Sequence, residues 1–252
     1  MNQYNMNIYA LQTARAGSKS VPNKNIMNIR GKSLYLHNIH YTQKSKLIKD
    51  VFISTDYDII KKDKTKHGYK IIDRPDYLCT DDCSHHDTMI HGLQEIEKTT
   101  GESCDILVVL FGNTLGAKTE DLDKALQMLI DNPEADSVQA VSEYTMFNPF
   151  RAFKVDDKGF LDTIVSQEFI KEKSLITNIN DRNSAGETYF MNGSFWIIRK
   201  NVLLEKKGKL PFPFLGYNIL PYHQETLMEL DAPWQIKFLE SGLGFSSWPF
   251  KK

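Results

Sequence analysis

The chain has 252 residues, of which 41% are hydrophobic and 25% charged, and its 31 basic and 32 acidic residues give a net charge of -1. This length and composition predict a soluble globular protein with one sizeable core. The balanced charge argues against a protein that binds nucleic acid or a membrane surface, because such proteins carry an excess of basic residues.

The cysteines and the first residues indicate the compartment in which the protein works. The chain contains three cysteines, Cys79, Cys83 and Cys104. An odd number of cysteines cannot form a complete set of disulfides, and the polar stretch 1–7 does not resemble a signal peptide. We therefore expect a cytoplasmic protein.

Several residues of metal-binding types lie close together near the first cysteine. They are Cys79, Cys83, His85, His86 and His91. Zinc is bound by cysteine and histidine, but this spacing matches no common zinc pattern. Structural roles for these residues are therefore the favoured interpretation.

The first predicted element is an apolar strand, Ile8 to Leu11, which leads into a loop rich in cations. The loop contains Arg15, Gly17, Ser18, Lys19 and Lys24. Glycine lets the backbone turn tightly and approach a ligand, while the hydroxyl and the three cations suit a bound phosphate. The spacing is neither that of the Walker loop nor GxGxxG, and a solvated turn is the alternative interpretation.

The order Arg-x-Gly-Ser-Lys-x-x-Pro-x-Lys-Asn at residues 15–25 resembles the loop of the CMP-sialic acid synthetase family. This family includes the cytidylyltransferases for legionaminic, pseudaminic and 3-deoxy-octulosonic acids. The resemblance implies that Arg15, Lys19 and Lys24 hold the triphosphate of CTP, with Arg15 and Lys19 acting in catalysis. It also assigns four residues to nucleotide binding: Ala14, Gly17, Ser18 and Asn25. The departure from the usual Arg-Gly-Gly-Ser-Lys is Ala16.

Strands and helices alternate after this loop, which predicts a parallel, doubly wound α/β sheet. The predicted elements are a helix within 33–45 that starts near Gly31, a strand at Val51–Ser54, a helix at Tyr57–His67 and a strand at Lys70–Asp73. Asp56 follows the second strand, where it either faces a ligand or caps the next helix.

Arg74-Pro75-x-x-Leu78, followed by Ser84 before a helix predicted at His85–Lys98, also resembles the synthetases. The resemblance implies that Arg74 and Ser84 contact the cytosine. A guanidinium can donate to a pyrimidine carbonyl, and Ser84 can contact the base while also capping the helix.

The most apolar run, Ile106–Leu110, is the predicted central strand, and the residues after it depart from the family. Sialic acid synthetases usually have Gln-Pro-Thr-Ser-Pro-Leu-Arg there, whereas this chain has Phe111 in the Gln position and Ala117 in the Arg position. Octulosonate enzymes have Gln-Gly-Asp with the Asp on magnesium, and Asn113 would be a weaker, uncharged ligand. We expect Phe111 and Asn113 at the acceptor site and leave the acceptor open.

A helix at Thr119–Ile130, capped by Thr119, and a strand at Val138–Val141 are predicted next. The segment 147–190 is irregular and resembles the family's excursion, which completes the acceptor site of a second subunit. The resemblance therefore implies a homodimer. It assigns acceptor binding to Arg151, Arg182, Tyr189 and Asn192, although Asn192-Gly193 is also a common turn before the strand predicted at 194–198.

Glu229 and Asp231 lie at i and i+2 of an extended segment, so both carboxylates point the same way and suit one divalent cation. The family's counterpart, Asp-x-Asp-Thr, holds the magnesium that bridges the CTP phosphates. Asp231 as a cap of the helix predicted at Trp234–Glu240 is the alternative.

The resemblance covers nearly the whole chain. It implies a three-layer, Rossmann-like α/β fold of the nucleotide-diphospho-sugar transferase type, with a mostly parallel sheet in a single domain 1–252 and the excursion at 147–190. It also implies a cytidylyltransferase that uses CTP and Mg2+, has Asp231 as a catalytic metal ligand, and acts on an acidic 2-keto sugar. The alternatives are another acceptor, such as a sugar phosphate, polyol phosphate or phosphonate, and a non-catalytic nucleotide-binding homologue.

Overall fold

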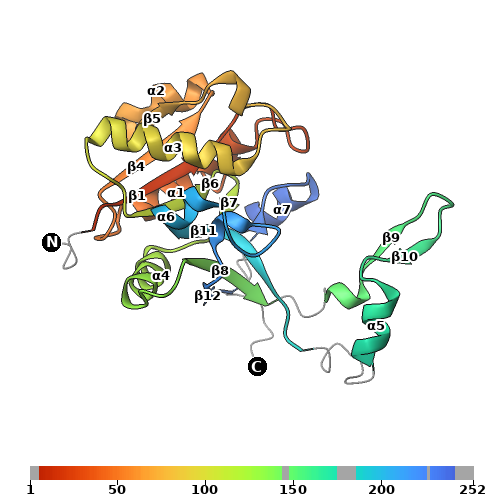
Figure 1. Ribbon diagram of the computed structural model, residues 1–252. Helices are drawn as coiled ribbons and strands as arrows, with labels where there is room; N and C mark the ends of the chain where they lie inside the picture. Colours follow the sequence, from red (N-terminus) through yellow and green to blue (C-terminus); the bar gives the residue numbers. More distant parts are fainter. Residues whose placement is uncertain (1–5, 144–147, 175–185, 226–227, 242–252) are drawn as a thin grey trace. The chain divides into compact units, whose positions relative to one another are not determined.

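The computed structural model describes residues 6–143, 148–174, 186–225 and 228–241 (Figure 1). The chain divides into two compact units, one formed by Met1–Ala140 with Asn192–Lys252 and the other by Val141–Met191. None of the helices in the described ranges is both long enough and apolar enough to cross a bilayer. Cys79, Cys83 and Cys104 are free thiols.

A seven-stranded sheet, in the order β12-β8-β11-β6-β1-β4-β5, is the centre of the fold. Its strands are β1 (Ile8–Thr13), β4 (Asp50–Thr55), β5 (Lys70–Asp73), β6 (Ile106–Phe111), β8 (Ser137–Glu143), β11 (Tyr189–Arg199) and β12 (Ile219–His223). β1 pairs in parallel with β4 and β6, and β4 with β5, whereas β11 is antiparallel to β6. The carboxyl ends of four parallel strands therefore meet at one edge.

Helices cover both faces of this sheet (Figure 1). They are α1 (Leu34–Thr42), α2 (Asp58–His67), α3 (His85–Thr100), α4 (Thr119–Asp131), α6 (Lys200–Glu205) and α7 (Trp234–Glu240). The face with Ile8 and Ala10 packs in one cluster with residues of α1 and α4. On the other face, a Cβ at Gly92 of α3 would lie 2.3 Å from Leu11 Cδ2. The predicted three-layer α/β fold is confirmed.

Small elements connect these layers. They are β2 (Asn28–Ile29), β3 (Lys32–Ser33), β7 (Thr114–Leu115), β13 (Met228–Glu229), and the 3-10 helices η1 (Lys24–Ile26), η2 (Asp76–Leu78) and η5 (Pro213–Leu215). β2 and β3 pair as a hairpin whose turn residues, Arg30 and Gly31, have φ of 53 and 87°. This hairpin delays the first helix, which we predicted to start near Gly31, to Leu34.

Three predictions about helix caps had different outcomes. Ser84 caps α3, because its Oγ accepts a hydrogen bond from the Asp87 amide at 3.1 Å, as predicted. Thr119 does not cap α4: the cap is Lys118, and the Thr119 hydroxyl donates to the Tyr41 carbonyl at 2.8 Å. Asp56 does not cap α2, whose cap residue is Tyr57.

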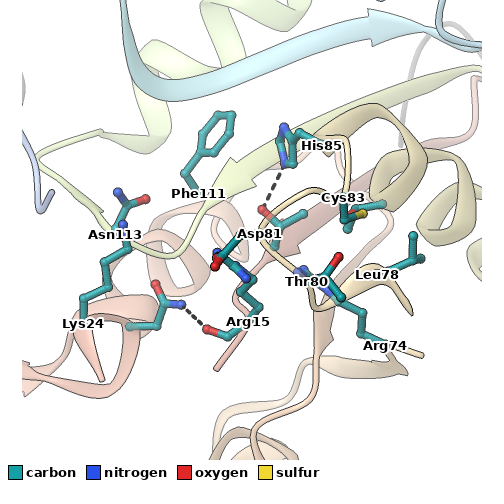
Figure 2. Close-up of a pocket in the computed structure, with 13 residues that line it drawn as sticks. Arg15, Lys24, Arg74, Leu78, Thr80, Asp81, Cys83, His85, Phe111 and Asn113 are labelled. Carbon is teal, nitrogen blue, oxygen red and sulfur yellow. Dashed lines mark hydrogen bonds and ion pairs between the residues drawn. The ribbon is translucent and has the colours of Figure 1, made fainter. Parts of the chain in front are cut away.

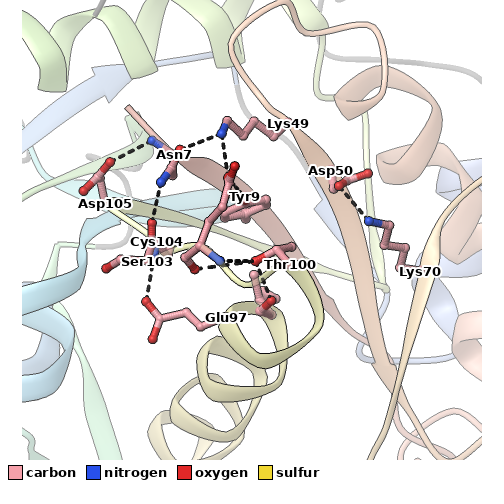
Figure 3. A network of polar contacts seen from close by, with 12 residues as sticks. Asn7, Tyr9, Lys49, Asp50, Lys70, Glu97, Thr100, Ser103, Cys104 and Asp105 are labelled. Atoms are coloured by element: carbon pink, nitrogen blue, oxygen red, sulfur yellow. Dashed lines mark hydrogen bonds and ion pairs between the residues drawn. The ribbon is translucent and has the colours of Figure 1, made fainter. Parts of the chain in front are cut away.

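The amino ends of the parallel strands are joined by a polar network (Figure 3). The Asn7 amide donates to Asp105 at 2.7 Å, and Lys49 Nζ lies 2.6 Å from both Asn7 Oδ1 and Glu102. Tyr9 donates to the same Glu102, and burial raises the pKa of Tyr9 to about 12. The polar side chains at the amino ends of the strands therefore bind one another, and the candidate ligand site is sought at the carboxyl ends.

The second unit contains a hairpin and a helix. Its elements are η4 (Pro149–Arg151), β9 (Phe153–Val155), β10 (Leu161–Thr163) and α5 (Gln167–Ser174). β9 and β10 are antiparallel, and Asp156 Oδ1 accepts from the amides of Lys158 and Phe160 at 2.9 and 2.8 Å. The segment 147–190, which we predicted to be irregular, therefore contains a short hairpin and a helix of eight residues.

Candidate active site

A pocket of about 310 Å³ lies at the carboxyl ends of β1, β5 and β6. Six predicted site residues line it: Arg15, Lys24, Asn25, Arg74, Phe111 and Asn113. In Figure 2, Arg15 lies at the middle of the group, with Lys24 and Asn113 on one side and Arg74 on the other. Ligands of open α/β sheets bind at this edge, so the pocket is the candidate active site.

The loop after β1 is held against the strands beside it. Ala14 is buried, and its carbonyl accepts a hydrogen bond from Thr55 Oγ1 at 2.6 Å. The Ala16 amide donates to Asp56 Oδ1 at 2.6 Å, so Asp56 supports the loop. Gly17 has φ +76°, a left-handed conformation that glycine adopts without strain. Ser18 beside it is half-buried.

Two cations of this loop share one carboxylate. Arg15 Nη1 donates to the Cys79 carbonyl at 2.7 Å, and Arg15 Nη2 donates to Asp81. Lys19, which is exposed, pairs with the other oxygen of Asp81. Hydrogen bonds from Lys19 and Arg15 hold the pKa of Asp81 below its usual value. The positive charges predicted to bind phosphate are thus balanced within the chain.

Asn25 fastens the loop to itself and to the end of β6. Its Nδ2 donates to the Arg15 carbonyl at 3.0 Å. A Cβ at Gly112 would lie 3.0 Å from Asn25 Oδ1 and 3.1 Å from Ala14 Cβ. Gly112 therefore allows the β6 end and the loop to approach more closely than other residues would permit.

Arg74 is buried beneath the pocket with 7% of its surface exposed. Its Nε and Nη2 donate to Ser54 Oγ and the Ser54 carbonyl at 3.0 and 2.8 Å, and burial lowers its pKa. These bonds fix the plane of the guanidinium while the side chain lines the pocket. Ser84 caps α3, and its neighbours Cys83 and His85 line the pocket in its place.

Aromatic rings form another wall of the pocket. Phe111 lies with its ring centroid 5.2 Å from that of His85 and 4.9 Å from that of Trp196. His85 Nε2 is 3.2 Å from Thr13 Oγ1, and burial lowers the pKa of His85 to about 4. His85 is therefore a neutral ring at neutral pH. Ala117 packs against the core cluster and does not line the pocket.

The two predicted metal ligands lie beside the end of β6. β13 pairs with β7, which sets Glu229 opposite Thr114, and the next amide, Leu230, donates to the Asn113 carbonyl at 2.8 Å. Asp231 Oδ1 accepts from Lys24 Nζ at 2.7 Å and from Asn113 Nδ2 at 3.2 Å. The carboxylate of Asp231 does not cap α7, whose cap is Pro233.

Glu229 is packed against a glycine. Gly193 has φ +69°, and a Cβ there would lie 1.8 Å from Glu229 Oε1. Burial and the negative charge of Asp231 raise the pKa of Glu229. Glu229 and Asp231 are neighbouring carboxylates, and a divalent cation between them would offset their mutual repulsion.

A model of the cytidylyltransferase family matches residues 10–245. The chain belongs to this family. Post-translational flagellin modification protein B of Campylobacter coli is 29% identical over 231 residues, covering 90% of this chain and 91% of that protein. CMP-N,N'-diacetyllegionaminic acid synthase of Campylobacter jejuni subsp. jejuni serotype O:2 is 27% identical over 230 residues, with the same coverage of 90% and 91%.

Among solved structures, a CMP:2-keto-3-deoxy-manno-octonic acid synthetase complexed with CTP is similar in fold. It has a TM-score of 0.67 and 16% identity, and the match covers 95% of this chain and 99% of that one. The predicted resemblance to sugar-acid cytidylyltransferases is confirmed, and with it the enzyme class.

The donor set of this cytidylyltransferase fits magnesium. Mg2+ takes oxygen ligands, and nucleotide enzymes often supply it with only one or two carboxylates besides phosphate and water. Glu229 and Asp231 provide the carboxylates, and Asn113 adds an amide beside them. No group of three His, Cys, Asp or Glu side chains in the described ranges is placed to share a metal.

The residues weighed for zinc have other contacts in the cytidylyltransferase. The thiols of Cys79 and Cys83 donate to the carbonyls of Pro75 and Ser84 at 3.5 and 3.3 Å. His86 Nε2 lies 2.9 Å from the Leu203 carbonyl. These contacts tie the start of α3 to its surroundings.

The remaining acceptor predictions are dispersed. Asn192 is buried within β11 and is not in a turn, its Nδ2 donating to Gln224 Oε1 at 3.2 Å. Arg151 and Tyr189 belong to the second unit and are exposed, and Tyr189 donates to Glu187. Arg182 lies outside the described residues.

Several pocket residues were missed by the sequence reasoning. They are Thr13, Leu78, Thr80, Asp81, Cys83, His85 and Thr88. The acidic pair Asp81-Asp82 was the available signal for Asp81, because its negative charges could pair with the cations of the loop at residues 15–25. Cys83 and His85 were weighed only as residues of metal-binding type, and no sequence pattern placed them at the pocket.

Proposed function

We propose that this cytidylyltransferase transfers CMP from CTP to an acidic 2-keto sugar of the nonulosonate type and releases pyrophosphate. The observation that carries the proposal is the convergence of the cationic loop, Arg74 and the Glu229–Asp231 pair at one edge of the sheet. A nucleotide triphosphate needs cations for its phosphates, a hydrogen-bond donor for its base and carboxylates for its metal ion, all within the length of one nucleotide. The name of the Campylobacter jejuni relative, a CMP-N,N'-diacetyllegionaminic acid synthase, supports a sugar-acid product.

In the proposed reaction an acceptor hydroxyl oxygen attacks the α-phosphorus, and the bond to the β-phosphate oxygen breaks. Arg15, Lys19 and Lys24 balance the negative charge that develops on the leaving pyrophosphate. The hydroxyl proton passes to solvent as the new phosphodiester forms. Because alignment and charge neutralisation supply most of the acceleration in such displacements, no covalent intermediate is needed.

We assign the metal to Glu229 and Asp231, beside which the Asn113 Nδ2 donates to Asp231 Oδ1. Magnesium bound there would neutralise charge on the phosphates. Lys24, now on Asp231 Oδ1, leaves the other oxygen of that carboxylate available, since the Asp231 side chain is 55% exposed. The two carboxylates would hold the cation, and Lys24 would balance charge on the phosphates beside it.

The base is assigned to the surroundings of Arg74. Its guanidinium is fixed by Ser54 and lines the pocket, and a cytosine carbonyl is a suitable acceptor for its remaining N–H donors. The neutral His85 adds a polar ring that carries no charge toward the base.

We further propose a cytoplasmic homodimer. The second unit exposes large apolar side chains: Phe153, Val155, Phe160, Leu161 and Ile164. A soluble protein rarely leaves so many exposed apolar side chains on one small unit without a partner. The three free thiols agree with a reducing compartment. Analytical ultracentrifugation tests the dimer: a monomer at micromolar concentration would contradict it.

Two measurements test the activity. Calorimetric titration with CTP, UTP, ATP and GTP is expected to give CTP the highest affinity. Pyrophosphate release is expected only with CTP, magnesium and a suitable sugar acid. Tight CTP binding without pyrophosphate release for any sugar acid, sugar phosphate, polyol phosphate or phosphonate would identify a non-catalytic nucleotide binder.

A further inference from the structure

Asp81 occupies the two cations that the proposed function assigns to the triphosphate. Its two carboxylate oxygens are taken separately, Oδ1 by Arg15 Nη2 and Oδ2 by Lys19 Nζ. A second Arg15 nitrogen donates to the carbonyl of Cys79, two residues before Asp81. The loop between η2 and α3 therefore lies against the cation-binding loop at the pocket, where Asp81 is also a lining residue (Figure 2).

Asp81 is held there by these cations alone. Within the described residues, its carboxylate has no partner besides Arg15 and Lys19, and the side chain is 40% exposed. A carboxylate fixed by backbone amides would be costly to move. This one can rotate into solvent once another anion takes its two partners, because exposed ion pairs contribute little to stability.

The other cation of the loop is paired differently. Lys24 contacts Asp231, and Asp231 is a proposed metal ligand that the reaction needs. Asp81 is assigned no part in holding metal, base or acceptor. Its negative charge lies beside Arg15 and Lys19, where the proposed function places the phosphates of the nucleotide. These two cations lower the pKa of Asp81, so the carboxylate is ionised at neutral pH.

The geometry points to Asp81 as an internal counter-ion that competes with the polyphosphate for Arg15 and Lys19 and so sets the affinity of the site for nucleotides. The inference rests on the proposed function for the identity of the ligand. A nucleotide enters by exchange: its phosphate oxygens replace the carboxylate of Asp81 on Arg15 Nη2 and Lys19 Nζ, and that carboxylate turns into solvent. Ligands without a polyphosphate do not displace Asp81 and gain nothing from its removal.

The test compares two neighbouring substitutions, Asp81→Asn and Asp82→Asn. Both remove one negative charge from exposed, adjacent positions, but Asp82 has no ion pair within the described residues. Calorimetry at low ionic strength would measure the Kd for inorganic tripolyphosphate, CTP and cytidine. We expect Asp81→Asn to tighten tripolyphosphate and CTP about three- to tenfold, and Asp82→Asn to change them less than about twofold. Cytidine binding should be unchanged by either.

A second comparison isolates the two cations. In an Arg15→Gln, Lys19→Gln background, Asp81→Asn is expected to give no gain in tripolyphosphate affinity, because nothing remains to be released. Circular dichroism confirms that each variant is folded, and Asp81→Ala serves as a second substitution that cannot accept a hydrogen bond.

Three outcomes would overturn the inference. Weaker or unchanged tripolyphosphate binding by Asp81→Asn would make Asp81 a positioning residue for Arg15, and an equal gain in Asp82→Asn would mean a general effect of charge. If neither the wild type nor Asp81→Asn binds tripolyphosphate, the inference that Asp81 competes with a polyphosphate is also wrong. The predicted gain without CTP-dependent pyrophosphate release would support the counter-ion and refute the proposed function.

Discussion

The Nζ atom of Lys24 lies 2.7 Å from a carboxylate oxygen of Asp231, although 207 positions separate the two residues in the sequence. The Lys24 side chain is 19% exposed and that of Asp231 is 55% exposed, so the carboxylate stays accessible to solvent. Asn113, after β6, donates to the same oxygen. Three distant segments of the chain thus meet at one atom, and the proposed metal and phosphate sites share a boundary there.

We predict that Asp231→Asn abolishes turnover with little loss of stability. The amide keeps the volume of the carboxylate but loses the charge that would bind magnesium, and the exposed site should limit the change in unfolding free energy to less than about 1 kcal/mol. Steady-state rates against magnesium concentration and thermal unfolding measure the two effects.

Asp50→Asn is the matched control for Asp231→Asn. Asp50 also pairs with a lysine, Lys70, at 2.8 Å, but at the start of β4 and away from the pocket. It should retain activity. Near-normal rates for Asp231→Asn at saturating magnesium would show that Asp231 is no metal ligand.

Gly193→Ala and Gly17→Ala should differ sharply. Both glycines have positive φ, +69° and +76°, so each substitution brings backbone strain of about 1 kcal/mol. A Cβ at Gly193 also overlaps Glu229, whereas no atom lies within 4 Å of one at Gly17. We expect Gly193→Ala to lose about 1 to 3 kcal/mol more than Gly17→Ala in urea unfolding and to need more magnesium for activity. Equal losses would mean that Glu229 moves aside without cost.

Arg74→Lys should lower both stability and the preference for CTP. An ammonium cannot donate to Ser54 Oγ and the Ser54 carbonyl in the plane of a guanidinium, so about 1 to 3 kcal/mol of unfolding free energy is at stake. Ser54→Ala is the control, since it removes one of these bonds and keeps the guanidinium. If Arg74→Lys binds CTP over UTP as well as the wild type does, Arg74 is structural and does not read the base.

The acceptor preference should follow Phe111. An aromatic ring stands where the family has a hydrogen-bonding amide, and each missing bond to a sugar hydroxyl costs roughly 1 to 3 kcal/mol. N-acetylneuraminate should therefore be a poorer acceptor than legionaminic or pseudaminic acid, and Phe111→Gln should narrow the difference. Steady-state rates at fixed CTP measure this, with an unchanged KM for CTP as the control. N-acetylneuraminate as the best acceptor of the wild type would show that Phe111 does not set specificity.

His85 should make the protein sensitive to mild acid. Its pKa in the folded state is about 4, below the ordinary value of 6.5, so the unfolded chain takes up the proton first. The contribution of His85 to the unfolding free energy is fully present above about pH 6.5 and is lost as the pH falls toward 4. The slope is at most about 1.4 kcal/mol per pH unit, and partial exposure of the ring makes it smaller. Urea unfolding of wild type and His85→Gln between these pH values should give slopes that differ by this amount. The pKa values of His37 and His40 are also lowered, but these residues are present in both the wild type and His85→Gln and so affect both slopes equally. Parallel slopes for the two proteins would therefore show that His85 does not cause the acid sensitivity.

The sequence by itself determined the elements whose signals are local. β5 at Lys70–Asp73 and α7 at Trp234–Glu240 have the predicted bounds, and Ser84 caps α3 as predicted, because strand propensity, helical periodicity and side-chain capping act within a few residues. The cation-binding loop at residues 15–25 was likewise recognisable from the order of its residues. So was the family, since motifs keep their order along the chain.

Only the tertiary structure decided which of these residues meet. Asp81 on Arg15 and Lys19, Glu229 against Gly193, and His85 between Thr13 and Phe111 join segments that no short-range pattern connects. Thr119 shows the same limit, because its hydroxyl bonds the Tyr41 carbonyl across the packed helices α1 and α4 and does not cap its own helix. A polar side chain takes the partner that the packed sheet and helices bring to it, and that partner is fixed by the fold as a whole.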